Sequence, residues 1–225
     1  MTAATHDFLS SLEADDIAAL ELLGTTRAFA RGQTLFHESQ LPDRVLVVRA
    51  GMVKVTSTTS AGREVVLAFR GAGELVGELA ALDGEPRSAT VRAIEGVSAL
   101  ALSVDAFRGF LESRPAVALI LLRMLARRLR DADAKRIEFA SSTTIERVAA
   151  RLLEFSERFG HEDASGTVHI ALPLSQEELA GSTGASIESV GRALQTLRTL
   201  SCVETRRREI RILDPGRLAA LRAEH

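Results

Sequence analysis

The chain has 225 residues, 46% of them hydrophobic, and a formal net charge of −2. This length accommodates two small domains or one large one, and the composition suffices for a buried core without any sign of disorder. The near-neutral charge does not indicate a dedicated nucleic-acid binder, which often carries a strongly basic balance. No apolar run approaches the roughly 20 residues of a membrane-spanning helix, and residues 1–7 lack the basic and apolar regions of a signal peptide. We therefore expect a cytoplasmic protein with no membrane partner.

Metal and redox chemistry find little support in the sequence. Cys202 is the only cysteine, which rules out an internal disulfide and a multi-cysteine iron–sulfur site within one chain. No His-x-x-x-His or Glu-x-x-His pair is present, and nothing resembles a nucleophile with its base. We therefore expect that the protein has no metal cofactor and is not an enzyme. A haem held by one histidine is an open alternative. The candidates for it are His6, His37, His161 and His169.

The first hundred residues predict a helix followed by many short strands. The helix is expected near 7–22. Glycines separate the β-branched runs that follow, a pattern typical of a β-roll or barrel. The expected strands are 45–48, 53–56, 65–68, 90–94 and 98–102.

Within this β-rich half, residues 76–89, here called the cassette, carry a carboxylate near one end and an arginine near the other. Gly77 lets the backbone come close to a ligand, and the Glu78 carboxylate can accept a hydrogen bond from a ribose hydroxyl. Arg87 has a donor fork that matches phosphate oxygens, and Ser88 adds a hydroxyl beside it. The cassette is therefore a candidate site for a sugar and a phosphodiester. A surface turn with an exposed ion pair is the alternative.

The pattern becomes helical after residue 103. A short helix is expected over 104–112, and Pro115 ends it. A long amphipathic helix is expected over 116–139, which at 1.5 Å per residue would be about 36 Å long. Such a helix needs a surface to lie against.

The segment 141–144 breaks the helical pattern, and we place a domain boundary there. Thr143 and Glu146 form a capping box that begins a new helix, which is expected to end at Phe159. A polar loop over 160–166 and a short strand over 168–172 follow.

Residues 175–200 have the residue types that a helix-turn-helix requires. Ser175 begins a helix through a Ser-x-x-Glu capping box. Ala180 is small where two helices would cross, and Gly184 can adopt the left-handed conformation of the turn. Ser186 then caps a recognition helix that runs to about residue 200.

A basic segment follows the recognition helix. Residues 202–213 have the character of a hairpin, with Arg206, Arg207 and Arg208 at its tip, as in a wing. Residues 192–222 carry eight arginines against three acidic residues, a local charge of +5. A basic face of this kind is what contact with phosphates at one end of the molecule requires.

The run Gly77-Glu78-Leu79 followed by Pro86-Arg87-Ser88-Ala89 resembles the phosphate-binding cassette of the cyclic-AMP receptor protein and fumarate-nitrate regulator family of bacterial transcription factors. The resemblance covers nearly the whole chain, because 31–36 and 45–55 are similar to the family's β-roll strands, and the long helix and helix-turn-helix follow in the family's order. It implies an α+β fold in three parts. These are a cyclic-nucleotide-binding β-roll domain over 1–115, a dimerisation helix and hinge over 116–140, and a winged helix-turn-helix DNA-binding domain over 141–225.

The resemblance also implies where a nucleotide would bind. Glu78 would bind the ribose, and Arg87 and Ser88 would bind the cyclic phosphate. Arg128 on the long helix matches the family's arginine that supports the cassette glutamate. Gly77 and Leu79 complete the sugar-phosphate side, which is intact in this sequence.

The base side departs from the family. Members that respond to cyclic AMP present a Thr-Ser or Thr-Asn pair to the adenine, and this sequence has Ala132 and Asp133 there. Arg70 occupies a place that is usually apolar and is a candidate to face the base. Asp133 and Arg70 together suit guanine; an ion pair of Asp133 with Arg70 or Arg136 at the dimer interface is the alternative. Family frequency nevertheless favours cyclic AMP.

The expected DNA contacts lie in the helix-turn-helix and the wing. Ser175 and Gln176 are placed for phosphates, and the Arg206–Arg208 tip is expected to contact phosphates as well. The candidates on the exposed start of the recognition helix are Ser186, Ile187, Glu188 and Arg192. Arg192 can read a guanine edge and Glu188 can accept from cytosine, whereas the best-studied members carry an arginine where this chain has Ile187.

The sequence thus predicts a homodimeric DNA-binding transcriptional regulator gated by a cyclic nucleotide effector, most readily cyclic AMP. Its expected partners are a double-stranded DNA operator and a second copy of the chain, with RNA polymerase as a further candidate. Two alternatives stay open. One is a regulator that responds to a guanine nucleotide, cyclic GMP or cyclic di-GMP, and the other is a ligand-independent DNA-binding protein with a vestigial pocket.

Overall fold

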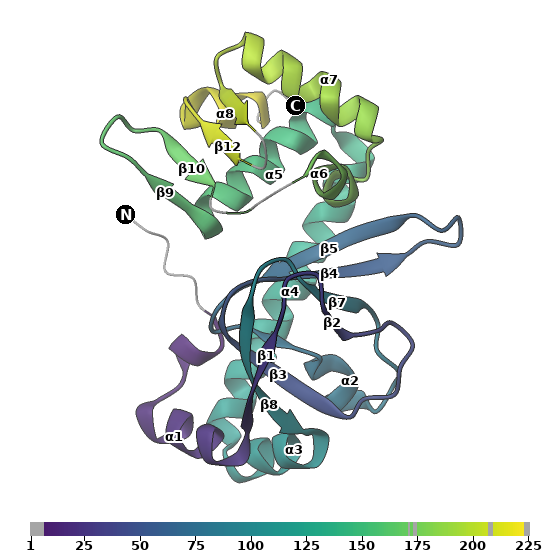
Figure 1. The fold of residues 1–225 in the computed structure, drawn as a ribbon, viewed down its shortest axis with the longest axis vertical. Helices are drawn as coiled ribbons and strands as arrows, with labels where there is room; N and C mark the ends of the chain where they lie inside the picture. Colours follow the sequence, from purple (N-terminus) through teal and green to yellow (C-terminus); the bar gives the residue numbers. More distant parts are fainter. Residues whose placement is uncertain (1–6, 171, 173–174, 207–208, 223–225) are drawn as a thin grey trace. The chain divides into compact units, whose positions relative to one another are not determined.

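The computed structural model describes residues 7–222 except 171, 173–174 and 207–208. The chain forms two compact units, the first ending at Asp131 and the second beginning at Ala132 (Figure 1). Each unit contains both helices and strands, which confirms the predicted α+β class. None of the described helices combines the length and apolar character needed to cross a bilayer.

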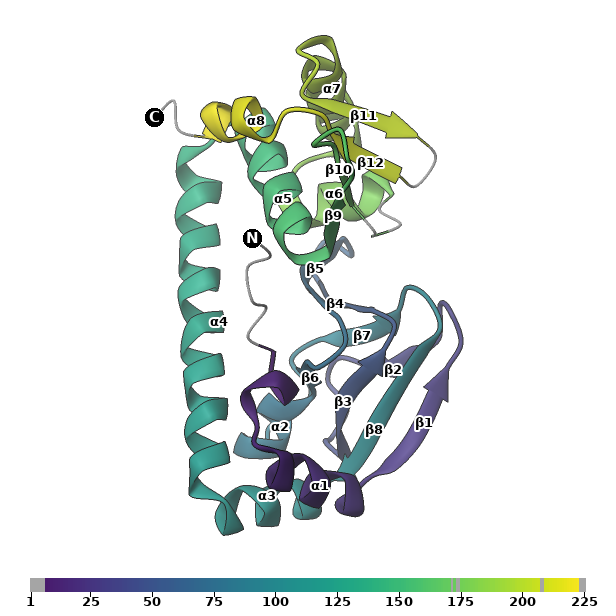
Figure 2. The ribbon, with the colours of Figure 1, turned by 90° about the vertical axis from the view of Figure 1, so that its left-hand side faces the viewer.

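Two four-stranded antiparallel sheets form the N-terminal unit (Figure 2). The first has the strand order β1 (Thr25–Phe29), β8 (Val97–Ser103), β3 (Arg44–Ala50) and β6 (Leu75–Val76), and the second has the order β2 (Thr34–Phe36), β7 (Thr90–Ala93), β4 (Val53–Thr58) and β5 (Glu64–Arg70). The five strands predicted from β-branched runs are confirmed as β3, β4, β5, β7 and β8. The turn from β3 to β4 requires glycine, because Gly51 has a φ of 80° and a Cβ there would lie 2.1 Å from the carbonyl oxygen of Gly96.

Strand β3 lies between two apolar cores. Val45 and Val47 belong to one buried cluster, while Leu46 and Val48 belong to the other. Successive side chains of a strand point to opposite faces of the sheet. The uninterrupted apolar run in β3 therefore marks a strand that is buried on both sides.

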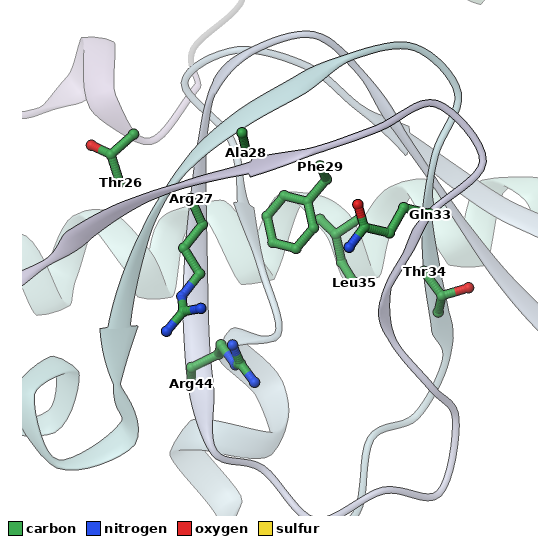
Figure 3. A pocket seen from close by; sticks show the side chains of 8 residues that line it. All are labelled: Thr26, Arg27, Ala28, Phe29, Gln33, Thr34, Leu35 and Arg44. Carbon is green, nitrogen blue, oxygen red and sulfur yellow. The ribbon is translucent and has the colours of Figure 1, made fainter.

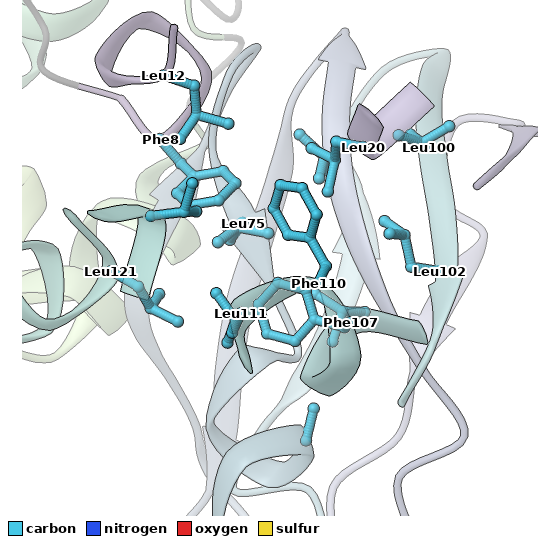
Figure 4. Packing of buried hydrophobic residues seen from close by; sticks show 14 residues of the cluster. Phe8, Leu12, Leu20, Leu75, Leu100, Leu102, Phe107, Phe110, Leu111 and Leu121 are labelled. Atoms are coloured by element: carbon cyan, nitrogen blue, oxygen red, sulfur yellow. The ribbon is translucent and has the colours of Figure 1, made fainter. Parts of the chain in front are cut away.

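One of these cores packs the first sheet against helices (Figure 4). The helices are α1 (Ala14–Leu23), α3 (Val104–Ser113) and the first turns of α4 (Pro115–Ser141). Phe107 is fully buried, and Leu102 and Leu121 are nearly so. Burying a side chain of this size contributes roughly 1.5–3 kcal/mol. The cluster anchors the start of α4 to the cassette-bearing unit.

The helix expected near 7–22 is wrong in its first half. The structure has a short 3-10 helix, Leu9–Ser11, followed by α1 from Ala14. Asp7 explains the break, because its side chain accepts a hydrogen bond from the Ser10 N–H at 2.7 Å and its carbonyl accepts from the Ser11 hydroxyl at 2.8 Å. Such local bonds compete with a regular helix.

The C-terminal unit contains the predicted helices in the predicted order. They are α5 (Thr144–Phe159), α6 (Gln176–Thr183) and α7 (Ile187–Thr199), and α8 (Pro215–Arg222) follows them. The Thr143 capping box is present, and α5 buries Val148, Leu152 and Phe155 as expected. A four-stranded sheet with the order β11 (Val203–Arg206), β12 (Glu209–Ile212), β10 (Val168–Ile170) and β9 (Gly160–Glu162) completes the unit.

Two features of this unit differ from the prediction. The polar loop expected over 160–166 begins as strand β9, which pairs with β10 and makes His161 the partner of His169. The final helix α8 was not predicted. The hairpin expected over 202–213 is confirmed as β11 and β12, but Arg207 and Arg208 at its tip lie outside the described residues.

Candidate functional site

The cassette begins where strand β6 turns sharply into the short helix α2 (Glu78–Asp83). Gly77 makes this turn with a φ of 84°, in the left-handed region that favours glycine. A Cβ at this position would also lie 2.6 Å from Nη1 of Arg87 and 2.8 Å from the Phe36 ring. Glycine is therefore required both by the backbone and by the close approach of Arg87.

Arg87 is the most enclosed charged group of the cassette, with 4% of its surface exposed. Nη1 donates to the carbonyl oxygen of Gly77 at 2.8 Å, and Nη2 donates to that of Arg44 at 2.6 Å. Nη2 also lies 3.3 Å from the Asp43 carboxylate, and the guanidinium stacks over the Phe36 ring at 3.9 Å. Burial lowers the pKa of Arg87 and Asp43 opposes this, but an arginine stays protonated in either case. The site thus holds a fixed positive charge.

Glu78 supplies the opposite charge at the other end of the turn, and 4% of its surface is exposed. Nη1 of Arg128 donates to Glu78 Oε1 at 2.5 Å, and Nη2 of the same arginine donates to the carbonyl oxygen of Leu75 at 3.1 Å. A fork held on a carboxylate and a carbonyl has little rotational freedom. Arg128 therefore fixes the orientation of Glu78 from helix α4.

The structure brings Gly77, Glu78, Arg87 and Arg128 together. Leu79 and Ser88, also within the cassette, have exposed side chains. Ala132 and Asp133 belong to the second compact unit. Whether any of these residues binds a nucleotide stays a prediction.

The two charged residues predicted to face the base have partners of their own. Arg70 lies 3.5 Å from Glu74 and donates to the carbonyl oxygen of Phe69 at 3.1 Å. Asp133 lies 3.9 Å from Arg136 on the same helix, and 58% of its side chain is exposed. Of the two ion pairs considered from the sequence, the structure contains the one between Asp133 and Arg136.

Sequence reasoning missed the residues that surround Arg87. Asp43 and Phe36 lie far from it in the chain, and no sequence motif links either of them to Arg87. Their loop is tied to the cassette through the backbone, because Arg87 N donates to the carbonyl oxygen of Gln40 and Ser39 N donates to that of Arg87, both at 2.8 Å. Long-range pairing of this kind leaves no periodic signal in the sequence.

A separate hollow of about 450 Å³ opens beside strands β1 and β2 (Figure 3). Arg27 and Arg44 both extend their side chains into it, and Phe29 and Leu35 contribute apolar surface. No residue predicted to bind ligand or DNA lines this hollow. Its link to the cassette is Arg44, whose carbonyl oxygen holds Arg87.

The candidate DNA-binding surface is built on α6 and α7. Ser175 caps α6, its hydroxyl accepting from the Glu178 N–H at 3.1 Å while the Glu178 carboxylate accepts from the Ser175 N–H at 2.8 Å. Gly184 ends α6 with a φ of 62°, and Ser186 caps α7 by accepting from the Ser189 N–H at 3.1 Å. Both predicted caps and the left-handed turn are confirmed.

Helix α7 divides into a buried and an exposed face. The buried residues are Val190, Ala193, Leu194 and Leu197. Ile187 is 51% exposed, and the side chains of Glu188 and Arg192 are exposed as well, forming an ion pair with each other. Gln176 and Arg206 are also exposed. The four residues proposed on the recognition helix thus lie on or beside its open face.

Comparison with known proteins points to the same combination of domains. A family model of the cyclic nucleotide-binding domain matches residues 26–114, and one of the Crp-like helix-turn-helix domain matches residues 146–221. The chain is 34% identical over 216 residues to the CRP-like cAMP-activated global transcriptional regulator of Mycobacterium tuberculosis, covering 96% of each chain. It is 29% identical to the transcriptional activator protein FnrA of Stutzerimonas stutzeri, covering 94% of this chain and 86% of FnrA.

A solved structure has a similar fold over most of the chain. The structure of FixK2 from Bradyrhizobium japonicum has a TM-score of 0.79 at 26% identity, covering 90% of this chain and 98% of FixK2. The fold, the cassette and the helix-turn-helix together define a transcriptional regulator with a cyclic nucleotide-binding domain and a DNA-binding domain. The chain belongs to the CRP/FNR family of transcriptional regulators.

Proposed function

We propose that this protein is a homodimeric transcriptional regulator whose binding to an operator is gated by cyclic AMP. The observation that carries the proposal is the pair of buried, opposite charges at the two ends of the cassette, Arg87 and Glu78, each 4% exposed. A fixed guanidinium suits a cyclic phosphate, and an oriented carboxylate suits the ribose hydroxyl. Between buried groups, such contacts are stronger than at an open surface.

Cyclic AMP is proposed as the effector because of the mycobacterial relative, whose name describes it as cAMP-activated. One observation favours a guanine nucleotide as the competing ligand. Asp133 stands where the resembling family uses hydroxyl or amide side chains, and its largely exposed carboxylate is able to accept hydrogen bonds from the guanine N1–H and amino group. The proposal therefore rests on the sugar-phosphate side, which both nucleotides share.

Helix α4 supports the proposed dimer. Leu119, Leu122, Leu129 and Ile137 are between 52% and 68% exposed. With 3.6 residues per turn, these positions fall on one face of the helix. An exposed apolar stripe of this length marks an interaction surface, and a second copy of α4 supplies a matching stripe in a two-fold arrangement.

On the DNA side, the exposed start of α7 is proposed to enter the major groove, where Arg192 reads a base and the Arg206–Arg208 tip contacts phosphate. Contact with RNA polymerase is proposed on the family resemblance alone.

A calorimetric titration of the purified protein with cyclic AMP, cyclic GMP and cyclic di-GMP tests the ligand assignment. We expect saturable binding of cyclic AMP with at most one site per chain and weaker binding of the two guanine nucleotides. Tighter binding of a guanine nucleotide would show that this nucleotide, and not cyclic AMP, is the effector. No binding of any of the three would show the pocket to be vestigial.

A further inference from the structure

A cluster of four charged residues links the end of α4 to the middle of α5. Lys135 and Glu138 stand one turn apart on α4, and Arg151 and Glu154 stand one turn apart on α5. Lys135 Nζ lies 3.4 Å from Glu154 Oε1, and Arg151 Nη2 lies 3.5 Å from Glu138 Oε1. Arg151 also pairs with Glu154 through Nη1. Each helix thus contributes one acid and one base, and the pairs cross from helix to helix. We call these four residues the ion cluster.

Arg151 is the centre of the ion cluster and is unusually buried for an arginine. Its side chain is 4% exposed, against 22% for Glu138 and 28% for Glu154. Its Nε–H has no hydrogen-bond partner among the described residues. Arg158 adds another positive charge, 3.8 Å from Glu154. The ion cluster therefore contains a buried charged group, Arg151, that does not make all of its possible hydrogen bonds.

Such an arrangement is a poor source of net stability. Taking charges out of water costs about as much as their attraction returns, and apolar residues of the same size often stabilise a protein more. What a buried ion pair does supply is a defined geometry, because leaving one partner unpaired is costly. In this protein the ion cluster defines how the end of α4 packs against the middle of α5.

The packing of α4 against α5 matters because each of these helices also contacts a functional part of the protein. Helix α4 also carries Arg128, whose guanidinium holds the cassette Glu78. Helix α5 packs against α6 and against the recognition helix α7. If α4 and α5 move together, a change in α4 at the nucleotide site is therefore passed on to α7 through α5.

We propose that Arg151 is a positioning residue for DNA binding: with Glu154 it locks the last turns of α4 to α5, so that the state of the nucleotide site sets the orientation of α7. The role in DNA binding rests on the proposed nucleotide gating. The contact between α4 and α5 does not, because it is present in the protein without a nucleotide and can be tested separately.

Three variants break the lock from different sides. Arg151→Met removes its centre, while Lys135→Met and Glu138→Gln each remove one link from α4 and leave Arg151 in place. Arg136→Met is the matched control, since Arg136 is adjacent on α4 and its side chain is 84% exposed and paired with Asp133 of the same helix. If Arg151→Met does not fold, the two α4 variants carry the test.

Hydrogen exchange of the free protein gives a readout that needs no ligand. The amides of residues 135–141 should exchange about tenfold faster or more in the three variants than in the wild type or the control, because the lock opposes local opening. Amides in the first turns of α4, which the apolar core holds, should be unchanged. Equal exchange at 135–141 in all five proteins would overturn the proposal.

Operator binding gives the second readout, the ratio of the dissociation constants without and with cyclic AMP. The ratio should fall toward one in Arg151→Met while the affinity for cyclic AMP in the absence of DNA changes less than threefold. A purely structural role would lower the melting temperature and leave this ratio as in the control, and that result would also overturn the proposal. A wild-type ratio of one would refute the nucleotide gating instead, and the exchange data would then decide on the lock by themselves.

Discussion

The Asp43 carboxylate lies 3.3 Å from Nη2 of the buried Arg87, so the cassette arginine has a counter-ion within the protein before any ligand phosphate arrives. The side chain of Asp43 is 55% exposed, whereas that of Arg87 is 3% exposed. The carboxylate is also held by Arg44, whose Nε donates to it at 2.7 Å, while the guanidinium of Arg87 stays in place through the carbonyl oxygens of Gly77 and Arg44.

Replacing Asp43 tests this competition. In Asp43→Asn the negative charge that opposes an incoming phosphate is removed, while a polar side chain of the same shape remains. Because the carboxylate is half exposed and screened by water, we expect the affinity for cyclic AMP to rise by no more than about 1 kcal/mol. Calorimetry at low and moderate salt measures the affinity for cyclic AMP. A loss of affinity would show that Asp43 positions Arg87 and does not compete with the phosphate for it.

Removing the guanidinium should have a far larger effect. Arg87→Ala is expected to weaken nucleotide binding by about 2–5 kcal/mol, the usual loss for a buried, charge-assisted contact. Arg63→Ala is the control, since Arg63 is an exposed arginine in the turn between β4 and β5. Circular dichroism should show the same fold in both variants. Unimpaired binding in Arg87→Ala would make the cassette assignment wrong.

The base side of the pocket gives a third prediction. Restoring Thr at Ala132 and Ser at Asp133 should tighten cyclic AMP by about 1–3 kcal/mol, the value of a buried hydrogen bond that is otherwise unmade. Cyclic GMP should bind unchanged or more weakly, because it loses the Asp133 carboxylate. Competition titrations decide between these outcomes, and a double variant that does not gain affinity for cyclic AMP would show that this face of α4 does not read the base.

The recognition helix and the wing should fail in different ways. Arg192→Ala is expected to cost about 1–3 kcal/mol of operator affinity and to relax preference at one base pair. Neutralising Arg206, Arg207 and Arg208 should weaken all DNA sequences alike and flatten the dependence on salt, since phosphate contacts release counter-ions. Binding measured on an operator and on scrambled DNA at several salt concentrations separates the two. Identical behaviour of the two variants would contradict this division of labour.

The ion cluster predicts a pH dependence of stability. Burial raises the pKa of Glu154, but Arg151, Lys135 and Arg158 lower it more, so that the net pKa lies below the usual 4.5. An acid whose pKa is lowered by folding stabilises the folded state above its unfolded pKa, and this contribution is lost as the pH falls through the folded pKa. The wild type should therefore exceed Glu154→Gln in unfolding free energy at neutral pH, and the difference should shrink below pH 4.5. A difference that grows on acidification would contradict it.

The sequence reveals those parts of the molecule whose residues act locally. The apolar run in β3, the Ser175 and Thr143 caps and the left-handed Gly184 each impose their own conformation, and each is found as predicted. Strand β1 was missed because Thr25–Ala28 are polar or small and exposed, so that pairing with β8 rather than its own pattern makes it a strand.

The environment of the candidate site was less predictable. The cassette motif places Gly77, Glu78 and Arg87 within one turn of chain, but the Asp43 contact depends on how two distant loops pair. Arg151 shows the same limit: an arginine on an amphipathic helix is expected to face solvent, whereas tertiary packing leaves only 3% of this one exposed. Tertiary contacts between charged groups have no sequence period to reveal them.

The most direct test of nucleotide gating is the affinity of the protein for its operator, measured by fluorescence anisotropy with and without cyclic AMP, using an operator selected from random DNA. We expect cyclic AMP to tighten operator binding in the wild type by about 5-fold to 150-fold, the usual range of coupling between two sites, and to have no effect on Arg87→Ala. Equal operator affinity of the wild type with and without the nucleotide would contradict gating and identify a constitutive DNA-binding protein.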